Sequence, residues 1–229
     1  MVKMVVFDLD GTLIDSMPVW TDIGARYMRT KGIDLAISVN YGLKLNGLEE
    51  KPVENYKTYV GNGREMLIRR AMGDAWTDHE LFEKVKADYD RHYAVHCNDH
   101  TAAYDGCAEM LEKLAEKGVK TGVLSNKPDE FVDKMLKKAF PNHKFTQAWG
   151  QKPQYKTKPE PDALLALLNM SGVTPEECFY VGDSDIDVFT ANNAGVKMAG
   201  VSWGFRGKNE LMNAGAPFVA DTTEELFDY

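Results

Sequence analysis

Short runs of apolar residues alternate along the chain with segments in which apolar positions recur every three or four residues. The first run, at residues 3–9, is rich in β-branched and aromatic side chains and stops at an Asp-Gly turn, which predicts a short buried strand. Similar runs predict strands at 120–124, 145–149, 178–181 and 196–201. Strands that alternate with helices predict a parallel sheet, and in such sheets ligands bind beyond the carboxyl ends of the strands.

Capping signals mark the helices between these strands. Helical periodicity over 106–117 is preceded by Asp105 as the expected N-cap and followed by Gly118. Thr174 and Glu177 form a capping-box pattern just before the strand at 178–181. A further helix is predicted over 188–194, ending at Gly195.

Residues 15–98 follow a different pattern. They contain no predicted strand, whereas amphipathic helical patterns occur at 18–31, 63–72 and 78–95. We therefore expect a helical insert of about 80 residues, at 15–98, between the two parts of a core formed by 1–14 and 99–229.

Composition narrows the function classes. The chain has 229 residues, 44% hydrophobic and 27% charged, as in ordinary folded proteins. Its formal net charge is -8, so we expect no nucleic-acid or membrane partner, because both are bound through clustered positive charge. A small anionic substrate needs only a few local cations. Three cysteines without metal spacing, and no apolar run long enough for a signal or membrane span, predict a cytoplasmic protein. The sequence leaves monomer and homodimer open.

Two carboxylates stand at the carboxyl end of the first predicted strand, in Asp8-Leu9-Asp10-Gly11-Thr12. Residues i and i+2 of a strand point to the same side, so Asp8 and Asp10 are expected to share a site. Gly11 allows the backbone to turn sharply and approach a ligand. Taken alone, the same pattern also fits a strand that ends in an ordinary turn.

Hydrogen-bond donors and cations follow later strands. Ser125 and Asn126 come directly after the strand at 120–124, where a hydroxyl and an amide can donate to a phosphate oxygen. The segment 156–161 contains two lysines and two prolines, and the restricted backbone could hold one ammonium in place for a phosphate. Spacing alone does not say which lysine acts, and both features also fit solvated loops.

Asp183, Asp185 and Asp187 lie within five residues after the strand at 178–181. Crowded carboxylates raise one another's pKa values unless a cation intervenes. Hard oxygen ligands without nearby His or Cys suit Mg²⁺ rather than zinc. An N-capping turn before the next helix would explain one of these aspartates but hardly three.

All of these features end predicted strands of one parallel sheet and therefore converge on one edge of it. Carboxylates, a hydroxyl, a lysine and an acidic metal site together suit phosphoryl transfer, in which one aspartate attacks phosphorus and a second moves a proton. In this order they resemble the four motifs of the haloacid dehalogenase superfamily, over the whole chain. The motifs are Asp8 to Thr12, Ser125-Asn126, Lys158-Pro159, and Gly182-Asp183 with Asp187.

The resemblance implies an α/β fold, in which a Rossmann-like, doubly wound parallel sheet core carries a small all-helical cap domain inserted after the first strand. It implies Asp8 as nucleophile and Asp10 as general acid/base, with Ser125 and Lys158 holding the phosphoryl group. It thereby selects Lys158 among the lysines. Gly11, Thr12 and Asn126 would complete the phosphate site.

The same resemblance implies a Mg²⁺ site. Asp8, the carbonyl group of Asp10, and Asp183 would bind the ion, with Asp187 supporting the site. Asp185 falls at a variable position and receives no role.

Within the superfamily the sequence is most similar to phosphoglycolate phosphatases. Residues 59–64, which include Gly63 and Arg64, resemble their substrate-facing glycine loop, and 104–106, 125–128 and 202–205 also match that group. Arg64 could pair with a substrate carboxylate, although a surface arginine at a helix start fits equally. The implied function is a Mg²⁺-dependent phosphatase that acts on a small phosphorylated metabolite, with 2-phosphoglycolate as first candidate, through an aspartyl-phosphate.

Other activities share this fold. A sugar-phosphate phosphatase, an inorganic pyrophosphatase and a β-phosphoglucomutase would use the same aspartates, whereas a dehalogenase would not need Asp10. A receiver-like phospho-switch, which is not an enzyme, also combines an acceptor aspartate with a metal, a hydroxyl and a lysine. It needs a stable phospho-aspartate, and a proton-transferring group two residues away works against that stability.

His92, His96 and His100 recur every four residues. This spacing could stack three imidazoles on one helix face as metal ligands. Asn98 and Asp99 indicate that the helix ends before His100, so we interpret the series as a polar face at the end of the last cap helix.

Overall fold

The computed structural model describes residues 1–15 and 34–228. The helix expected over 18–31 lies outside the described residues. The chain divides into two compact units: unit 1 comprises Met1–Ile14 and Ala103–Tyr229, and unit 2 comprises Asp15–Ala102.

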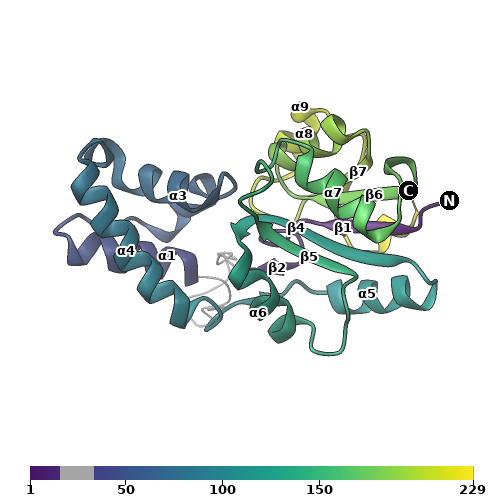
Figure 1. The fold of residues 1–229 in the computed structure, drawn as a ribbon, viewed down its shortest axis with the longest axis horizontal. Helices are drawn as coiled ribbons and strands as arrows, with labels where there is room; N and C mark the ends of the chain where they lie inside the picture. Colours follow the sequence, from purple (N-terminus) through teal and green to yellow (C-terminus); the bar gives the residue numbers. More distant parts are fainter. Residues whose placement is uncertain (16–33, 229) are drawn as a thin grey trace, which may run out of the picture. The chain divides into compact units, whose positions relative to one another are not determined.

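Unit 1 has the expected α/β, Rossmann-like fold. Among the described residues, six strands form one parallel sheet in the order β5-β4-β1-β6-β7-β8 (Figure 1). Their bounds are β1 Met4–Phe7, β4 Lys120–Pro128, β5 Gln147–Gln151, β6 Cys178–Gly182, β7 Lys197–Val201 and β8 Val219–Ala220. The five strands predicted from apolar runs are present, and β8 is an addition at the edge of the sheet.

Helices cover both faces of this sheet. In Figure 1, α5 and α6 lie on one face, whereas α7, α8 and α9 lie on the other. Their bounds are α5 Cys107–Glu116, α6 Asp129–Ala139, α7 Asp162–Ser171, α8 Asp185–Ala194 and α9 Lys208–Ala214. The position before α5 is occupied by Gly106 and not by Asp105, which was the expected N-cap. The capping box of Thr174 and Glu177 is present as predicted.

A hydrophobic cluster lies between the sheet and the helices α7, α8 and α9. Alternate strand residues such as Met4 and Val6 point into it, because successive side chains of a strand face opposite sides. From α7 and α8 it receives Ala163, Leu164, Leu167, Leu168, Val188, Ala191 and Ala194. This packing holds the carboxyl end of β1 level with those of its neighbours.

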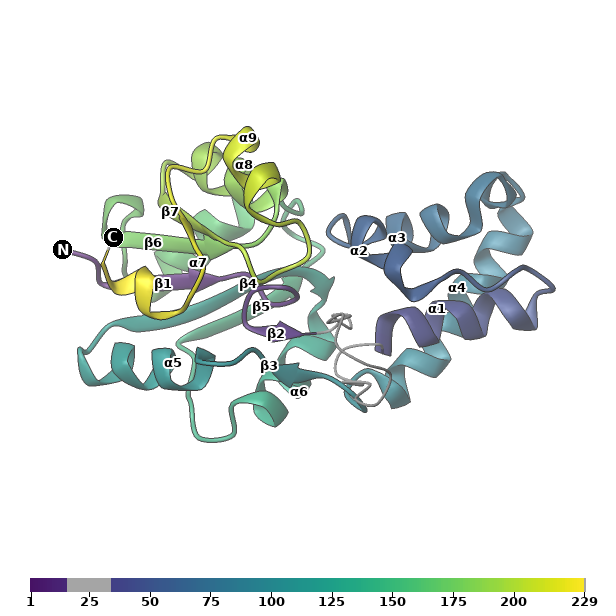
Figure 2. The same cartoon turned by 180° about the vertical axis from the view of Figure 1, so that it is seen from behind.

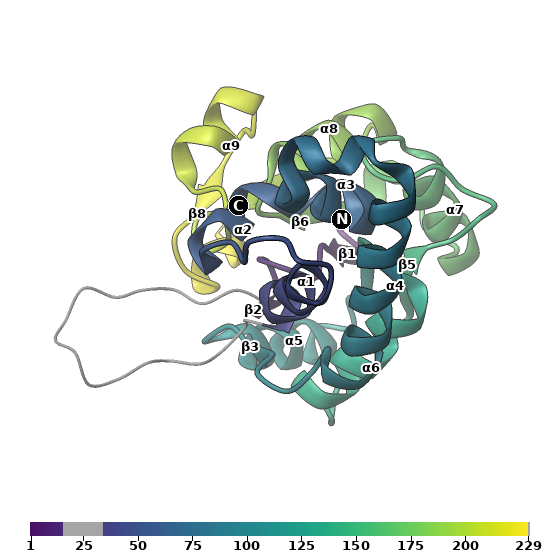
Figure 3. The same ribbon diagram turned by 90° about the vertical axis from the view of Figure 1, so that its left-hand side faces the viewer.

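Over its described residues between 34 and 101, unit 2 contains helices, turns and loops but no strand. Its α-helices are α1 Asp34–Leu45, α2 Tyr56–Tyr59, α3 Gly63–Met72 and α4 His79–His96. The longest, α4, packs against both α1 and α3 (Figure 3). Its buried side chains Phe82, Val85, Tyr89 and Tyr93 recur at helical spacing along one face, as expected for an amphipathic helix.

Two very short strands, β2 Ile14–Asp15 and β3 Ala102–Ala103, pair in a separate two-stranded sheet (Figure 2). None of the helices within the described residues has both the length and the apolar character needed to cross a membrane. Cys97, Cys107 and Cys178 are all buried and free, so none of them forms a disulfide.

Candidate active site

The candidate site lies where the strand order of unit 1 reverses. The chain passes from β1 to β4 and β5 on one side, and then returns to β6 on the other. Phe7, the last residue of β1, pairs with Val123 of β4 and with Val181 of β6. Residues that follow these three positions therefore emerge at one level, at the switch point where α/β sheets bind ligands.

Asp8 follows β1 directly and is largely buried. Its Oδ1 lies 2.8 Å from Nζ of Lys158, whose side chain is 3% exposed. The same ammonium group lies 2.7 Å from Oδ1 of Asp187. The structure thus places Lys158, rather than Lys156, between two carboxylates of the predicted site.

Asp187 is the most heavily bonded carboxylate of the group. Besides Lys158, its Oδ1 accepts a hydrogen bond of 3.0 Å from the Tyr180 hydroxyl. Its Oδ2 accepts from the backbone N–H and the hydroxyl of Ser184, at 3.1 and 2.6 Å. Both oxygens are therefore engaged, and Asp187 serves to fix Lys158 and the first turn of α8.

Asp183 is fully buried in the loop after β6 and is held from two directions. Its Oδ1 accepts from the Thr12 hydroxyl at 3.3 Å, and its Oδ2 accepts from the backbone N–H of Phe205 at 2.8 Å. Only glycine fits beside it, because a Cβ at Gly11 or at Gly204 would lie 2.3 Å from an atom of the Asp183 side chain. Gly11 also has a φ of +91°, which disfavours any larger residue.

Asp10 has a different cationic partner. Its Oδ2 lies 3.1 Å from Nζ of Lys127, whose side chain is 3% exposed. Its Oδ1 is buried and has no hydrogen-bond partner. A buried acceptor left without a partner is costly, and such groups in native proteins call for an explanation.

Ser125 and Asn126 lie near the carboxyl end of β4, as predicted. The Ser125 hydroxyl accepts a hydrogen bond of 3.2 Å from the backbone N–H of Lys127. The Asn126 amide bonds to the backbone of Lys158 in both directions, at 3.0 Å each. Asn126 thus ties the lysine loop to β4, and a phosphate contact by either side chain stays a prediction.

Burial dominates the electrostatics of the cluster. It raises the pKa of Asp8 to about 7, even though Lys158 acts to lower it. Burial raises the pKa of Asp183 well above its usual range, and Asp187 and Asp8 add to that shift. For Lys158, burial alone would lower the pKa, but Asp187 and Asp8 outweigh it and hold the pKa well above its usual value.

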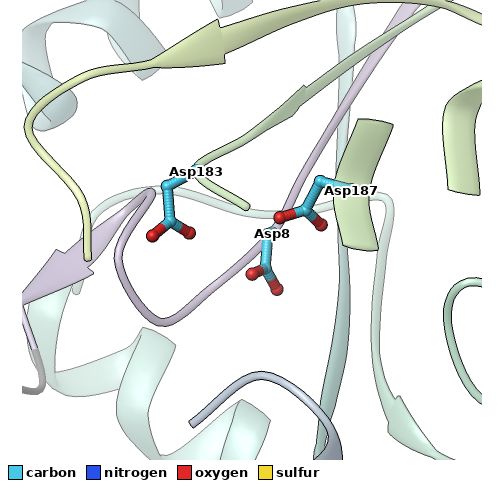
Figure 4. A group of neighbouring side chains, drawn as sticks. All are labelled: Asp8, Asp183 and Asp187. Carbon is cyan, nitrogen blue, oxygen red and sulfur yellow. The ribbon is translucent and has the colours of Figure 1, made fainter. Parts of the chain in front are cut away.

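Three carboxylates of this cluster fit a hard divalent cation. Asp8, Asp183 and Asp187 each offer an oxygen, and these oxygens lie within 4.8 Å of one another (Figure 4). With Asp10, four carboxylates face two buried lysines, so a doubly charged ion would balance the excess. An all-oxygen donor set of this kind suits Mg²⁺.

The raised pKa of Asp8 predicts a pH-dependent stability of the metal-free protein. Unfolded Asp8 loses its proton near 3.8, whereas the folded protein retains it to about 7. The folded state therefore binds more protons between these values, and the free energy of unfolding should fall as pH rises through that window. The full effect is on the order of 4 kcal/mol at most.

Urea unfolding with EDTA at pH 5 and pH 8 measures this effect. Asp8→Asn is the control, because the wild-type-minus-variant difference cancels the titration of groups that do not interact with Asp8. We expect the wild type to lose stability at pH 8 relative to the variant and to regain it on addition of Mg²⁺. A wild type that gains stability against the variant between pH 5 and pH 8 would contradict the assignment.

Unit 2 holds the remaining predicted residues. Gly63 begins α3 with a φ of +82°, and the Arg64 guanidinium forms two hydrogen bonds to Asp90, at 2.8 and 3.0 Å. Arg64 is thus already paired with a carboxylate within unit 2. The substrate contacts predicted for Gly63 and Arg64 stay predictions.

The three histidines of the series have separate partners. In the part of the chain that the structure describes, no group of ligand-bearing side chains besides Asp8, Asp183 and Asp187 comes within binding distance of one ion. His92 bonds to Ser38, His96 to Asp99 and His100 to Asp34. Helix α4 ends at His96, so the series leaves the helix before His100, as expected.

Several residues at the site were missed by sequence reasoning. Lys127 lies in the segment 125–128, which resembles the phosphoglycolate phosphatases, but nothing in the sequence shows that its ammonium group reaches Asp10. Tyr180 lies on β6 two residues before Gly182, so strand alternation could have placed its hydroxyl toward Lys158. Trp203 donates to the Thr12 carbonyl group at 3.0 Å, which ties the loop after β7 to the first motif.

Comparisons with known proteins agree with this architecture. Residues 5–201 match the family model of haloacid dehalogenase-like hydrolases. A phosphoglycolate phosphatase of Pseudomonas putida is 34% identical, covering 99% of this chain and 76% of that protein. A phosphoglycolate phosphatase of Vibrio parahaemolyticus is 31% identical, covering 99% of this chain and 95% of that protein. The crystal structure of a protein from Lactobacillus delbrueckii subsp. bulgaricus superposes with a TM-score of 0.85 at 30% identity, covering 98% of this chain and 96% of that one.

Proposed function

This chain belongs to the haloacid dehalogenase-like hydrolase family, and on that premise we propose that it is a Mg²⁺-dependent phosphatase of small phosphomonoesters, with 2-phosphoglycolate as its first candidate substrate. The observation that carries the proposal is the pair of aspartates after β1. Asp8 is poised against Lys158, and Asp10 presents a buried oxygen without a partner. The first can attack phosphorus and the second can move a proton.

In the first step, an oxygen of the Asp8 carboxylate attacks phosphorus in line with the ester oxygen. The new bond joins Asp8 to phosphorus, while the bond from phosphorus to the ester oxygen breaks. The protonated Asp10 carboxyl group gives its proton to the departing oxygen, so that a neutral alcohol leaves. Asp8 then carries the phosphoryl group as an acyl phosphate.

In the second step, water attacks phosphorus, and the Asp10 carboxylate takes one of its protons. The bond from phosphorus to Asp8 breaks, which releases inorganic phosphate and regenerates both carboxyl groups. Lys158 offsets the negative charge of the transferred group and remains anchored by Asp187. The Ser125 hydroxyl group, at the end of β4, is available to donate to a phosphoryl oxygen.

Asp8, Asp183 and the carbonyl group of Asp10 would hold Mg²⁺, with Asp187 as a supporting residue. When bound, the ion supplies positive charge to the phosphoryl oxygens. In its absence burial, together with the neighbouring carboxylates, raises the pKa values of Asp8 and Asp183.

This arrangement favours an enzyme over a phospho-switch. A receiver-like switch must preserve its phospho-aspartate, whereas an oxygen of Asp10 without a partner is suited to activate water against it. A dehalogenase has no need for this second carboxylate. We infer that the helical unit 2 acts as a cap that decides which ester is accepted.

The substrate proposal rests on the relatives. Phosphoglycolate phosphatases of Pseudomonas putida and Vibrio parahaemolyticus match this chain over almost its entire length. 2-Phosphoglycolate is a small phosphorylated metabolite that also carries a carboxylate. A substrate of this size is compatible with the proposed cytoplasmic enzyme, which we expect to bind no polyanion.

A substrate panel assayed with Mg²⁺ and ranked by kcat/KM tests this proposal. The panel contains 2-phosphoglycolate, a hexose 1-phosphate, a hexose 6-phosphate and inorganic pyrophosphate. We expect 2-phosphoglycolate to rank first, with inorganic phosphate and glycolate as products. Preference for pyrophosphate or a sugar phosphate would overturn the substrate, and conversion of hexose 1-phosphate to 6-phosphate would identify a mutase. No phosphate release from any ester would overturn the phosphatase itself.

A further inference from the structure

The side chain of Lys127 is a buried lysine of unit 1 that the proposed mechanism does not use. It is 3% exposed, although lysine is almost never buried unless it is paired. Its ammonium group lies 3.1 Å from Oδ2 of Asp10. A buried ammonium group next to the Asp10 carboxylate indicates that Lys127 has a role in the site.

The backbone explains how Lys127 reaches this position. The pairing of β4 with β5 shifts register between Leu124 and Pro128, so the ladder is irregular around Lys127. Irregularities of this kind occur next to active sites, where they alter the direction of side chains. The backbone N–H of Lys127 is fixed by the Ser125 hydroxyl, and Gly150 of β5 leaves no room for a Cβ against the Lys127 carbonyl group, at 2.4 Å.

The two oxygens of Asp10 are in unlike surroundings. Oδ2 faces the Lys127 ammonium group, whereas Oδ1 is buried without a hydrogen-bond partner. An anchored Oδ2 fixes the plane of the carboxyl group, so Oδ1 points in one direction instead of rotating among several. Groups that orient a reacting side chain in this way contribute strongly to rate, because a misplacement of about 1 Å can cost about 100-fold.

We propose that Lys127 is the positioning residue of Asp10: its ammonium group holds Oδ2 and thereby presents Oδ1 to the leaving oxygen and to water. This inference rests on the proposed function, since it assigns Asp10 the proton transfers. It differs from a role in binding, because Lys127 acts through Asp10 and not on the substrate. Loss of Lys127 should therefore lower kcat and leave KM nearly unchanged.

A double-mutant cycle tests this inference on the full chain, with p-nitrophenyl phosphate and 2-phosphoglycolate as probes in Mg²⁺. Lys127→Met should lower kcat on the order of 10–100-fold. Lys127→Arg, which keeps the charge, should recover part of that loss. In the Asp10→Asn background, Lys127→Met should lower kcat little further. A residue that acts through Asp10 has no effect once the Asp10 carboxyl group is absent.

Lys120→Met is the matched control, since Lys120 lies on the same strand and bonds to the backbone of Ser171 instead of a site carboxylate. Melting temperatures of all variants distinguish a loss of fold from a loss of kcat. If Lys127→Met is unstable, the comparison of kcat and KM is made with Lys127→Arg.

Three results would overturn the inference. The first is an unchanged kcat in Lys127→Met. The second is a double variant whose loss of kcat equals the product of the two single losses. The third is a rise in KM alone, which would indicate that Lys127 contacts the substrate. An inactive wild type would instead refute the proposed function, so the two failures are distinguishable.

Discussion

Replacement of Asp8 by asparagine is expected to abolish turnover, with kcat lowered roughly 10⁴-fold or more, while the fold remains intact. The amide has nearly the same shape but is a poor nucleophile, so no bond to phosphorus can form. Lys158 keeps a partner in Asp187, and the variant also removes one of the mutually repelling buried charges. Steady-state phosphate release, with a thermal melt of each protein, measures both effects.

Asp185→Asn is the matched control for this experiment. It removes a carboxylate at the start of α8, in the same acidic segment, that has no assigned role. We expect its turnover to stay close to that of the wild type. Turnover near the wild-type rate in Asp8→Asn would refute the assignment of the nucleophile.

Replacement of Asp10 by asparagine is expected to lower kcat roughly 10²–10⁴-fold, because an amide can neither give nor take the proton. The effect should be larger for 2-phosphoglycolate than for p-nitrophenyl phosphate, whose leaving group departs without protonation. Hydrolysis of the phosphoenzyme should also slow, so that a burst of nitrophenol precedes a slow steady state. Stopped-flow absorbance gives the burst and the steady rate together.

Equal losses for both esters, without a burst, would contradict the role given to Asp10. The same traces address the phospho-switch. A wild-type enzyme that stays phosphorylated for minutes in Mg²⁺ would favour a switch over a phosphatase. We expect the wild type to return to its unphosphorylated form rapidly, because Asp10 is in place to activate water.

Much of the fold follows from local sequence signals. The apolar runs predict β1, β4, β5, β6 and β7, and the helix predicted over 63–72 has the bounds observed for α3. Parallel strands flanked by helices leave one plausible edge for a site. By contrast, β2, β3 and β8 have two residues each, and runs that short carry no periodicity.

The candidate site was predictable in its residue types but not in its contacts. Motif order drew attention to Asp8, Lys158 and Asp187, and the structure brings these three together. The partner of Asp10 could not be read from the sequence, because Lys127 lies far from Asp10 in the chain, on β4. The register shift in β4 likewise depends on pairing with β5, which leaves little local signal.

The net charge of -8 does not describe the charge at the candidate site. Part of the acidity is concentrated at one sheet edge, where two buried lysines offset it and a divalent cation would offset the rest. Bulk charge argues against long polyanions as partners, but it does not exclude a small phosphate ester that meets Lys158 and Mg²⁺.

The most direct test is to trap the covalent intermediate. Asp10→Asn protein is mixed with p-nitrophenyl phosphate in Mg²⁺, quenched in acid within one turnover and digested for peptide mass spectrometry. We predict one added phosphoryl group on Asp8, absent when Asp8→Asn is combined with Asp10→Asn. A phosphoryl group on another residue, or nitrophenol release in that first turnover without any phosphorylated peptide, would contradict Asp8 as the nucleophile.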